Sequence, residues 1–351
     1  MSDEVLIQPG RLRSFCGDLL ERTGVPAGEA RILADILVEA DLEGIDSHGV
    51  ARMPDYLNRL RHGGIRRVMR VEAIVDRAAI AVFDAYQSIG HVAAQHIMSI
   101  AIKKAKAAGI SFVTARNSNH YGVAGYFAKM ALGNDMIGFT GTNAAARIPP
   151  YGGRTPLFGT NPFAVAIPAG KRLPVVADMA SSVVARGKII LAAKKNQPIP
   201  RGWAINSEGE DTTDARSALE GAVLPFGGPK GSAIAMIIET LTSMLAGAMP
   251  SIDIPDMRSD PSGPGHISHY FGAIDIAAFG PVDLFKAQVD RMIKQVKEGP
   301  RAKGVEEIYV PGEIQSNCRQ KRLEKGIPIA DVTVQALERE GALCGVSGSL
   351  L

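Results

Sequence analysis

Apolar residues recur with a helical period in the N-terminal part of the chain. The first stripe has the spacing i, i+3, i+7 and i+8 and consists of Leu12, Phe15, Leu19 and Leu20. This spacing predicts an amphipathic helix with one face in a core. A second helix is predicted between the break at 24–26 and Gly44, and a shorter third helix before 63–64. The N-terminal part therefore predicts a small helical unit.

Beyond residue 70, short apolar runs alternate with helical patterns. Strands are predicted over 71–75, 79–84, 110–115, 136–142, 163–167, 175–179, 203–206 and 270–276. Helices are predicted over 91–108, 125–132, 183–194, 233–248 and 283–297. This alternation indicates α/β layering. The polar segment 315–340 predicts further helix with a break at 326–328.

Composition narrows the class of protein. The 351 residues are 46% hydrophobic and 21% charged, which excludes a disordered or fibrous chain. A net charge of +3 and an aromatic content of 5% give no sign of a nucleic-acid partner. The longest apolar stretch, 233–249, contains Glu239 and ends at Pro250, so it predicts a buried helix and not a membrane span.

The cysteines and the N-terminus bear on the compartment. Cys16, Cys318 and Cys344 are far apart and form no CxxC pair, which fits a reducing compartment and not a disulfide or zinc framework. The first residues mix both charges and lack an apolar leader. We therefore expect a cytoplasmic protein.

The common nucleotide signatures are missing. No G-x-G-x-x-G follows a predicted strand, and no G-x-x-x-x-G-K-[ST] occurs. Gly and Pro nevertheless number 38 and 21, more than average usage gives. If a nucleotide binds, its phosphates are held in another way.

Two polar clusters carry candidate chemistry. In 46–52, Arg52 follows His48 by four residues and could bind a carboxylate with its planar guanidinium; the alternative is a helix cap with a surface arginine. In 117–122, His120 follows a predicted strand, where it could exchange a proton near neutral pH; the alternative is a histidine that satisfies local backbone groups. No histidine has a carboxylate at metal-ligand spacing, so no metal site is expected.

Several glycine-containing loops could be plain turns or could let a ligand approach the backbone. They are 151–153, 158–162 and 226–231. In the last loop Lys230 opens a predicted helix and could meet a phosphate. Asp178, at a predicted strand end, could bind ribose hydroxyls or cap the next helix.

Taken together and in order, these motifs resemble the malate/L-lactate/L-sulfolactate dehydrogenase family, which is unrelated to the Rossmann-type lactate and malate dehydrogenases. The matching stretches are DSHGVARMPDYLNRLRHGGI (46–65), NSNHYGVAGYFAKMA (117–131), IPPYGGRTPLFGTNPFAVAIP (148–168), VADMASS (176–182), GPKGSAIAMIIETL (228–241) and VPGEIQ (310–315). The family also includes ureidoglycolate dehydrogenase, diketogulonate reductase and piperideine-2-carboxylate reductases.

The resemblance implies an α/β fold: a mixed-sheet, non-Rossmann NAD(P)-binding domain (76–298) and a helical domain built from both chain ends (1–75 and 299–351). It implies NAD(P)-dependent interconversion of small 2-oxo and 2-hydroxy acids by a homodimer. His120 is implied as the proton donor and acceptor, with His48 as its competitor. The implied substrate residues are Ser47, Arg52, Tyr56 and Thr160. The implied cofactor residues are His48, Asn143, Ala144, Gly159, Asp178, Met179, Ala180 and Lys230.

Two stretches depart from the family pattern. Ala144, Ala145 and Ala146 replace residues that are often polar, and Ile276 stands where Pro is usual. Arg147 and Arg154 could read a 2′-phosphate, so the choice between NAD and NADP stays open. The substrate is expected to be malate or sulfolactate, then lactate. A cyclic imino-acid reductase and a binding protein without catalysis are the alternatives.

Overall fold

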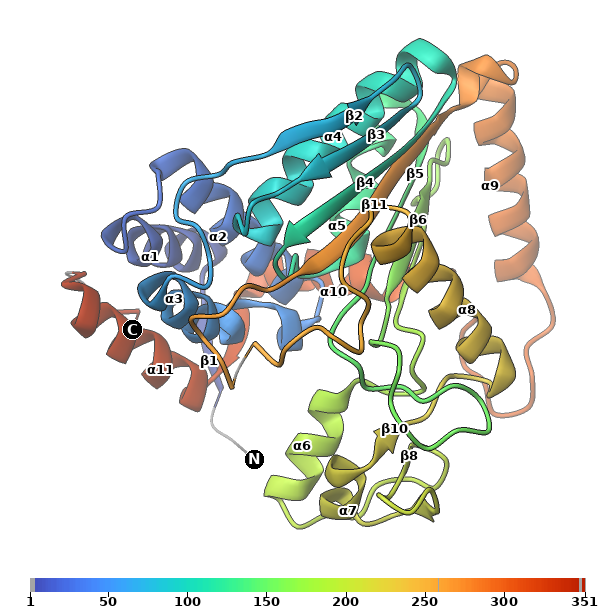
Figure 1. The fold of residues 1–351 in the computed structure, drawn as a ribbon. Helices are drawn as coiled ribbons and strands as arrows, with labels where there is room; N and C mark the ends of the chain where they lie inside the picture. Colours follow the sequence, from blue (N-terminus) through green and yellow to red (C-terminus); the bar gives the residue numbers. More distant parts are fainter. Residues whose placement is uncertain (1–3, 258, 347–348, 351) are drawn as a thin grey trace.

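A computed structural model describes residues 4–257, 259–346 and 349–350. Its centre is a seven-stranded sheet with the order β2-β3-β4-β11-β5-β6-β7 (Figure 1). The strands are β2 (Glu72–Asp76), β3 (Ile80–Asp84), β4 (Ile110–Ser118), β5 (Met136–Thr142), β6 (Phe163–Ile167), β7 (Val175–Met179) and β11 (Ile267–Asp275). β3 and β4 run parallel, whereas all other neighbours in this sheet are antiparallel. The predicted mixed sheet is therefore confirmed.

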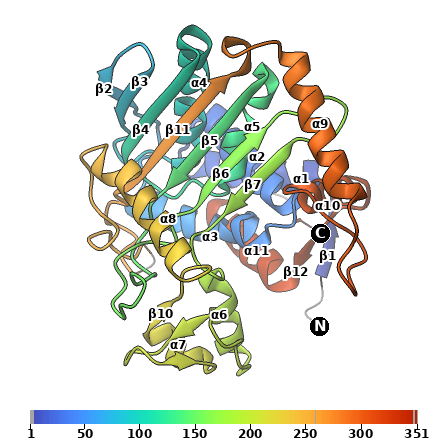
Figure 2. The same ribbon diagram turned by 90° about the vertical axis from the view of Figure 1, so that its right-hand side faces the viewer.

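Helices cover both faces of this sheet (Figure 2). On one face α4 (Gly90–Ala108) and α5 (Ala124–Lys129) pack on β4, β5, β6 and β11. The core there joins Val113 and Phe271 of the strands to Ile97 and Met98 of α4. On the other face lie α8 (Pro229–Glu239) and the π-helical turn η4 (Thr240–Met244). The helix α9 (Val282–Glu298) follows the short turn η5 (Ile276–Ala278), and η3 (Leu132–Asn134) leads into β5.

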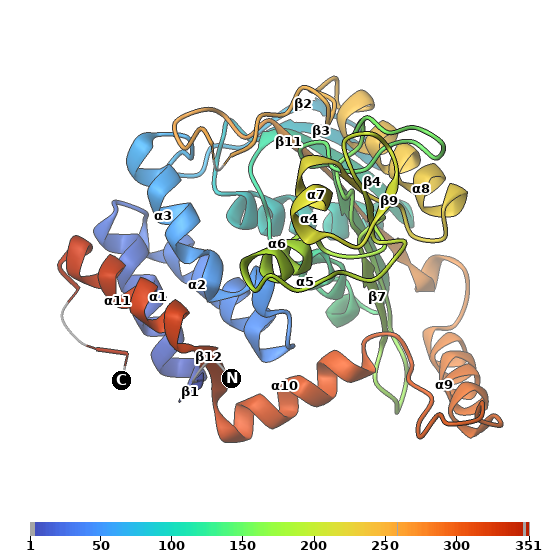
Figure 3. The ribbon, with the colours of Figure 1, turned by 90° about the horizontal axis from the view of Figure 1, so that it is seen from below.

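Both chain ends build one helical unit (Figure 3). The strands β1 (Glu4–Ile7) and β12 (Ile327–Ala330) pair antiparallel. The helix α11 (Asp331–Cys344) packs on α1 (Pro9–Arg22) and α3 (Met53–His62), and α10 (Glu313–Lys325) packs on α2 (Ala27–Leu42). Leu12, Leu19 and Leu337 are fully buried in their shared core, which confirms the predicted helical unit from both ends.

A third, small unit was not predicted as a unit, although its first helix (183–194) and its first strand (203–206) were. It comprises α6 (Arg186–Lys194), β8 (Ala204–Ile205), β9 (Asp211–Thr212), α7 (Ala215–Glu220) and β10 (Ala222–Val223), below the sheet in Figure 1. It has its own apolar cluster around Ile189, Ala204 and Val223. The strands β9 and β10, which were not predicted, have only two residues each, too few for an alternating pattern to be recognised.

Some predicted limits differ from the observed ones. The helix predicted over 233–248 begins at Pro229, and its α-helical part ends at Glu239. The break predicted at 326–328 opens β12 after Gly326, whose φ of +93° is a glycine conformation. The proposed boundary at 75/76 falls inside β2, and the outermost residues of the proposed helical domain lie outside the described ones. The division into domains stays a prediction.

Candidate functional site

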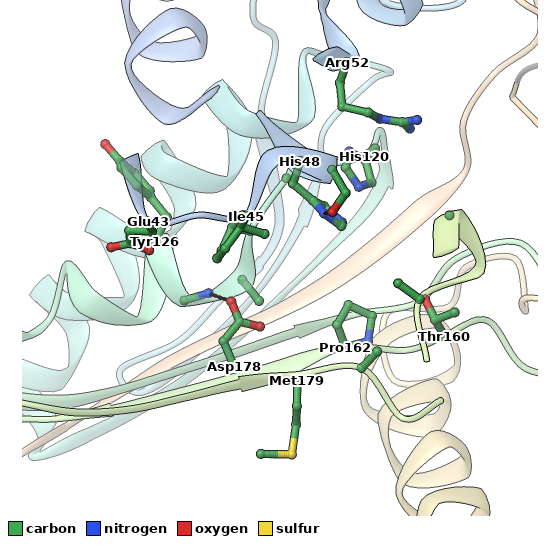
Figure 4. Close-up of a pocket in the computed structure, with 18 of the residues that line it drawn as sticks. Glu43, Ile45, His48, Arg52, His120, Tyr126, Thr160, Pro162, Asp178 and Met179 are labelled. Atoms are coloured by element: carbon green, nitrogen blue, oxygen red, sulfur yellow. Dashed lines mark hydrogen bonds between the residues drawn. The ribbon is translucent and has the colours of Figure 1, made fainter. Parts of the chain in front are cut away.

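A cleft of about 1840 Å³ lies between the helical unit and the sheet (Figure 4). Ten of the predicted site residues line it: Ser47, His48, Arg52, Tyr56, His120, Ala144, Thr160, Asp178, Met179 and Ala180. Pockets for drug-sized ligands usually measure about 300–1,000 Å³, so this cleft has room for two ligands side by side. Three predicted residues, Asn143, Gly159 and Lys230, are not among those that line it.

The helical wall of the cleft presents His48 on two short 3-10 turns, η1 (Asp46–His48) and η2 (Val50–Arg52). The fully buried Asp41 accepts a hydrogen bond from the Val50 N–H at 2.8 Å. A Cβ on Gly49 would lie 1.8 Å from the Asp41 carboxylate, so only glycine fits between the turns. Burial raises the pKa of Asp41 to about 7.

His48 itself is half-buried, and its Nδ1 lies 2.9 Å from the hydroxyl of the exposed Ser47. Burial, and secondly the charge of Arg52, lower the pKa of His48 to about 4. The imidazole is therefore neutral at pH 7. It can exchange one hydrogen bond with a ligand but carries no charge to attract an anion.

Arg52 and Tyr56 stand at the start of α3. The Arg52 guanidinium pairs with Asp55 at 2.9 Å and keeps about a fifth of its side chain exposed, at 21%. The Tyr56 hydroxyl is buried and lies 2.7 Å from Nδ1 of His120, and burial raises its pKa to about 12. The neutral Tyr56 hydroxyl of the helical wall thus fixes the His120 ring of the sheet wall.

His120 follows the central strand β4 and is fixed through its neighbour Asn119. The Asn119 amide donates to the carbonyls of Gln87 and Ser88 and accepts from the buried Arg59. Burial, and secondly the charge of Arg52, hold the pKa of His120 well below its usual range. The His120 and His48 ring centroids are 5.6 Å apart, so both histidines face one volume (Figure 4).

Two further histidines, His91 and His269, lie close to this pair, and the sequence patterns assigned no role to them. His91, fully buried, packs edge-on against Tyr56 with centroids 5.1 Å apart, and lies 6.1 Å from the His120 ring. Its neighbour Gly122 must lack a side chain, because a Cβ would lie 2.8 Å from His91 Nε2. Burial lowers the pKa values of both His91 and His269 to about 3. The site therefore holds four neutral imidazoles.

The carboxylate of Glu239 fixes the loop that carries Thr160. Asn161, at φ +31°, donates to the Ala235 carbonyl and to Glu239. The buried Glu239 also accepts from Ser243 and Ser251, so its oxygens are satisfied. The sequence signal for this residue is a single carboxylate within an apolar helix. Glu239 was noted only as an argument against a membrane span.

The far end of the cleft holds the predicted cofactor residues at the end of β7. Asp178 accepts a hydrogen bond from the Gly125 N–H at 2.6 Å, and the surrounding protein raises its pKa (Figure 4). Met179 is exposed to the cleft. The buried hydroxyl of Ser182 also lines it and bonds to none of the described residues, so it offers a polar contact to a ligand.

The remaining predicted residues contact other protein groups or lie away from the cleft. Asn143 is buried and binds the Ser268 N–H and the Met249 carbonyl. A Cβ on Gly159 would lie 2.4 Å from the Ala144 carbonyl, so this glycine accommodates protein backbone and not a ligand. Lys230 is exposed at the start of α8, and Ile276 is buried outside the residues that line the cleft. Their roles toward a cofactor stay predictions.

Two features are absent from the described part of the chain. Within residues 4–257, 259–346 and 349–350, no three His, Cys, Asp or Glu side chains are grouped so that they could hold a metal ion. In the same ranges, no helix combines the length and the hydropathy that a membrane crossing requires.

Comparisons with known proteins agree over nearly the whole chain. A sequence profile of the malate/L-lactate dehydrogenases matches residues 7–338. L-sulfolactate dehydrogenase of Methanocaldococcus jannaschii is 38% identical over 318 residues, 91% of this chain and 91% of that protein. Malate dehydrogenase of Pyrococcus horikoshii is 37% identical over 352 residues, covering 98% and 97%.

A third relative is named for a different activity. The Δ1-pyrroline-2-carboxylate/Δ1-piperideine-2-carboxylate reductase of Pseudomonas putida is 31% identical over 330 residues, covering 93% of this chain and 94% of that protein. The solved structure of the M. jannaschii sulfolactate dehydrogenase superposes with a TM-score of 0.92 at 36% identity, covering 99% and 98%. The arrangement of elements is therefore shared as well as the sequence.

Proposed function

This chain belongs to the malate/L-lactate dehydrogenase family, a family of oxidoreductases, and we propose that its reaction is hydride transfer between a nicotinamide cofactor and C2 of a small 2-oxo or 2-hydroxy acid. Malate or sulfolactate is the first candidate substrate and lactate the second. The observation that carries the proposal is the facing pair of Arg52 and His120 in one cleft. Arg52 binds the carboxylate of the substrate, and His120 exchanges a proton with the oxygen on the adjacent carbon.

Arg52 fixes the orientation of the substrate. Its planar guanidinium binds a carboxylate in two hydrogen bonds and so aligns the neighbouring C2. Asp55, bound at 2.9 Å, restricts the rotation of the arginine before the substrate arrives. This role requires an arginine, because a lysine presents a single point charge.

His120 handles the proton. With its pKa held below the usual range, the free enzyme contains a neutral ring that accepts the proton of a substrate hydroxyl during oxidation. When Nδ1–H donates to Tyr56, the Nε2 lone pair is left for this step. In the reductive direction the substrate carboxylate offsets the charge of Arg52, which favours the protonated ring that the reduction consumes.

The residues at the far end of the cleft fit a nicotinamide cofactor. The Ser182 hydroxyl, which bonds to none of the described residues, offers a donor to ribose hydroxyls, and the Asp178 carboxylate, held by Gly125, offers an acceptor. When bound, the cofactor supplies or takes up the hydride. The apolar side chain of Met179, exposed in the same wall, can cover a planar ring. Turnover and melting temperature with each cofactor decide between NAD and NADP.

The test combines binding and turnover. NADH and NADPH are each offered with oxaloacetate, sulfopyruvate and pyruvate, and the loss of reduced cofactor is followed by its absorbance. We expect turnover with at least one of these acids, and a higher melting temperature with the preferred cofactor. If neither cofactor is oxidised by any 2-oxo acid, the proposed reaction is wrong.

A second candidate reaction is reduction of a cyclic imino acid. It is favoured by the similarity to the P. putida reductase, whose substrates also carry a carboxylate beside the carbon that is reduced. Adding Δ1-piperideine-2-carboxylate to the same panel distinguishes the two reactions. A preference for the imine over every 2-oxo acid would favour this second candidate.

We also propose a cytoplasmic homodimer. The outer face of α8 and η4 leaves four large apolar side chains about half exposed: Met236, Ile237, Met244 and Leu245. Contiguous exposed apolar side chains are typical of protein interfaces. The three free cysteines support a reducing compartment. Light scattering tests the dimer, and a monomeric mass at micromolar concentration would contradict it.

A further inference from the structure

We propose that Arg147 and Asp256 form a second anion subsite in the cleft, which receives the distal acid group of a 2-oxo diacid. This inference rests on the proposed function and narrows its substrate class. A diacid carries one acid group beside the reacting carbon and one at its other end, so two cationic groups are needed to hold it. Arg52 serves the first group, and the subsite serves the second.

Arg147 has a fixed backbone beside the Thr160 loop. Its N–H donates to the Phe158 carbonyl at 2.7 Å, and its own carbonyl accepts from Val223 at 3.1 Å. The next residue, Ile148, forms a β-bridge with Phe158, two positions before Thr160. The arginine is therefore anchored to the segment that leads to Thr160, whereas Arg52 stands on the helical wall.

Asp256 pairs with Arg147, and its neighbour in the sequence is bound by the helical wall. Its carboxylate lies 2.5 Å from the terminal nitrogen Nη2 of Arg147. The adjacent Met257 accepts a hydrogen bond from Arg59 at 3.3 Å. Arg59 stands on α3, one helical turn after Tyr56, and also holds Asn119. Arg59 therefore contacts both the neighbour of His120 and the neighbour of Asp256.

The Arg147 guanidinium has capacity for a ligand. Of its five N–H groups, contacts with the described residues engage one on Nη2, to Asp256, and one on Nη1, to the Ala146 carbonyl. The side chain is 29% exposed, and both Arg147 and Asp256 line the cleft. Arg147 and Arg52 are therefore both aspartate-paired arginines that line one cleft.

A phosphate of the cofactor is the other anion that an arginine here could bind. The cofactor residues Asp178 and Ser182 lie at the end of β7, whereas Asp256 is tied through Met257 to α3 and the catalytic histidine. At the other end, Arg186 and Lys194 of α6 line the cleft and supply positive charge. The placement therefore favours the substrate, and the cofactor phosphate becomes an outcome of the test.

The experiment compares Arg147→Met with the wild type in the full-length protein. The readout is the ratio of kcat/KM for oxaloacetate to that for pyruvate, measured with one cofactor. We expect this ratio to fall about 10- to 100-fold, the effect of losing a charged hydrogen bond to one substrate only. Arg147→Lys should retain part of the preference, because it keeps the charge but not the planar fork.

Arg154→Met is the matched control. Arg154 is close in sequence, pairs with Glu208 at 3.5 Å, is 60% exposed and is not among the residues that line the cleft. Its substitution should leave the ratio unchanged. If Arg147→Met folds poorly, Asp256→Asn provides a second test: it keeps the arginine and removes the neutralising charge, so the preference for the diacid should hold or rise.

The outcomes separate the two proposals. If the wild type turns over no 2-oxo acid, the proposed function is wrong. If the wild type is active and Arg147→Met keeps the wild-type ratio, the subsite is wrong. If Arg147→Met keeps this ratio but changes the preference between NADPH and NADH, the subsite is also wrong and Arg147 is assigned to the 2′-phosphate. If the ratio falls as much in Asp256→Asn as in Arg147→Met, the ion pair has only a structural role and the subsite is wrong.

Discussion

The two walls of the cleft each present a neutral histidine, but they hold it differently. His120 follows a nine-residue strand, and its neighbour Asn119 is bound by Arg59 and by two backbone carbonyls. The ring itself contacts the hydroxyl of Tyr56 from the opposite wall. His48 stands on a three-residue turn, and the hydroxyl that contacts it belongs to the exposed Ser47.

This difference bears on which histidine transfers the proton. A group that exchanges a proton in the transition state must be held in a narrow range of positions, because small displacements reduce the rate strongly. His120 is fixed by contacts from both the sheet and the helical unit, whereas His48 depends on the turn held by Asp41. The comparison favours His120 as the catalytic residue and assigns His48 to binding.

The largest expected effect separates the two histidines directly. His120→Asn should lower kcat about 10²- to 10⁴-fold, the usual contribution of a general acid or base. His48→Asn keeps a hydrogen-bonding side chain and should lower kcat less, with most of its effect on KM. Steady-state kinetics of both variants checks this order. Equal or larger losses of kcat in His48→Asn would reverse the assignment.

The next effect concerns the stability of the helical wall. The pKa of Asp41 is about 7 in the folded protein against an ordinary value of 3.8. Between these values the folded state holds a proton that the unfolded state has released, so stability falls as the pH rises from about 4 to about 7. Asp41→Asn removes this dependence and should be more stable than the wild type above pH 7, by up to a few kcal/mol.

Urea unfolding of both proteins at about pH 4.5 and about pH 8, the two sides of this range, measures the difference. The anchor of His120 consists of Arg59, an amide and backbone groups, none of which titrates there. Asp178, whose pKa is also raised, is present in both proteins, so the difference between them reports the carboxyl of Asp41. A stability difference that is the same at both pH values would contradict the role of Asp41.

The smallest effect tests the contact between the walls. Tyr56→Phe removes the hydroxyl 2.7 Å from His120 Nδ1 and keeps the ring that packs on His91. We expect kcat to fall about 3- to 10-fold, the value of one hydrogen bond, with a smaller change in KM. If Tyr56 acts only on the substrate, as the family resemblance implies, KM should rise while kcat stays near the wild-type value.

The sequence alone predicted the α/β class and most of the strands, since runs such as 136–142 and 163–167 are apolar and bounded by turn residues. It did not predict β1 and β12, because a pair of four-residue strands from opposite chain ends has no local signal. The glycines of 158–162 and 226–231 were read as possible ligand loops. At Gly159 and Gly231, however, a Cβ would lie 2.4 Å from a carbonyl of the protein itself.

The motifs identified His48, Arg52 and His120 because functional side chains in loops stand out beside turn residues. They could not identify Arg59, Glu239 or His91, which resemble ordinary helix residues in the sequence and gain their partners only when distant segments meet. Arg147 was noted as a possible reader of a 2′-phosphate, but its partner Asp256 lies 109 positions further along the chain and meets it only in the folded protein.

The sequence by itself thus determined the class of fold and the chemical groups of the site, because periodicity and side-chain chemistry are local properties. Tertiary structure decided which groups face one another and in which charge state. Burial beside Arg52 makes His120 neutral, and the approach of α3 to β4 brings Tyr56 to its ring. Desolvation and proximity depend on the whole packed molecule, so neither can be obtained from any single stretch of residues.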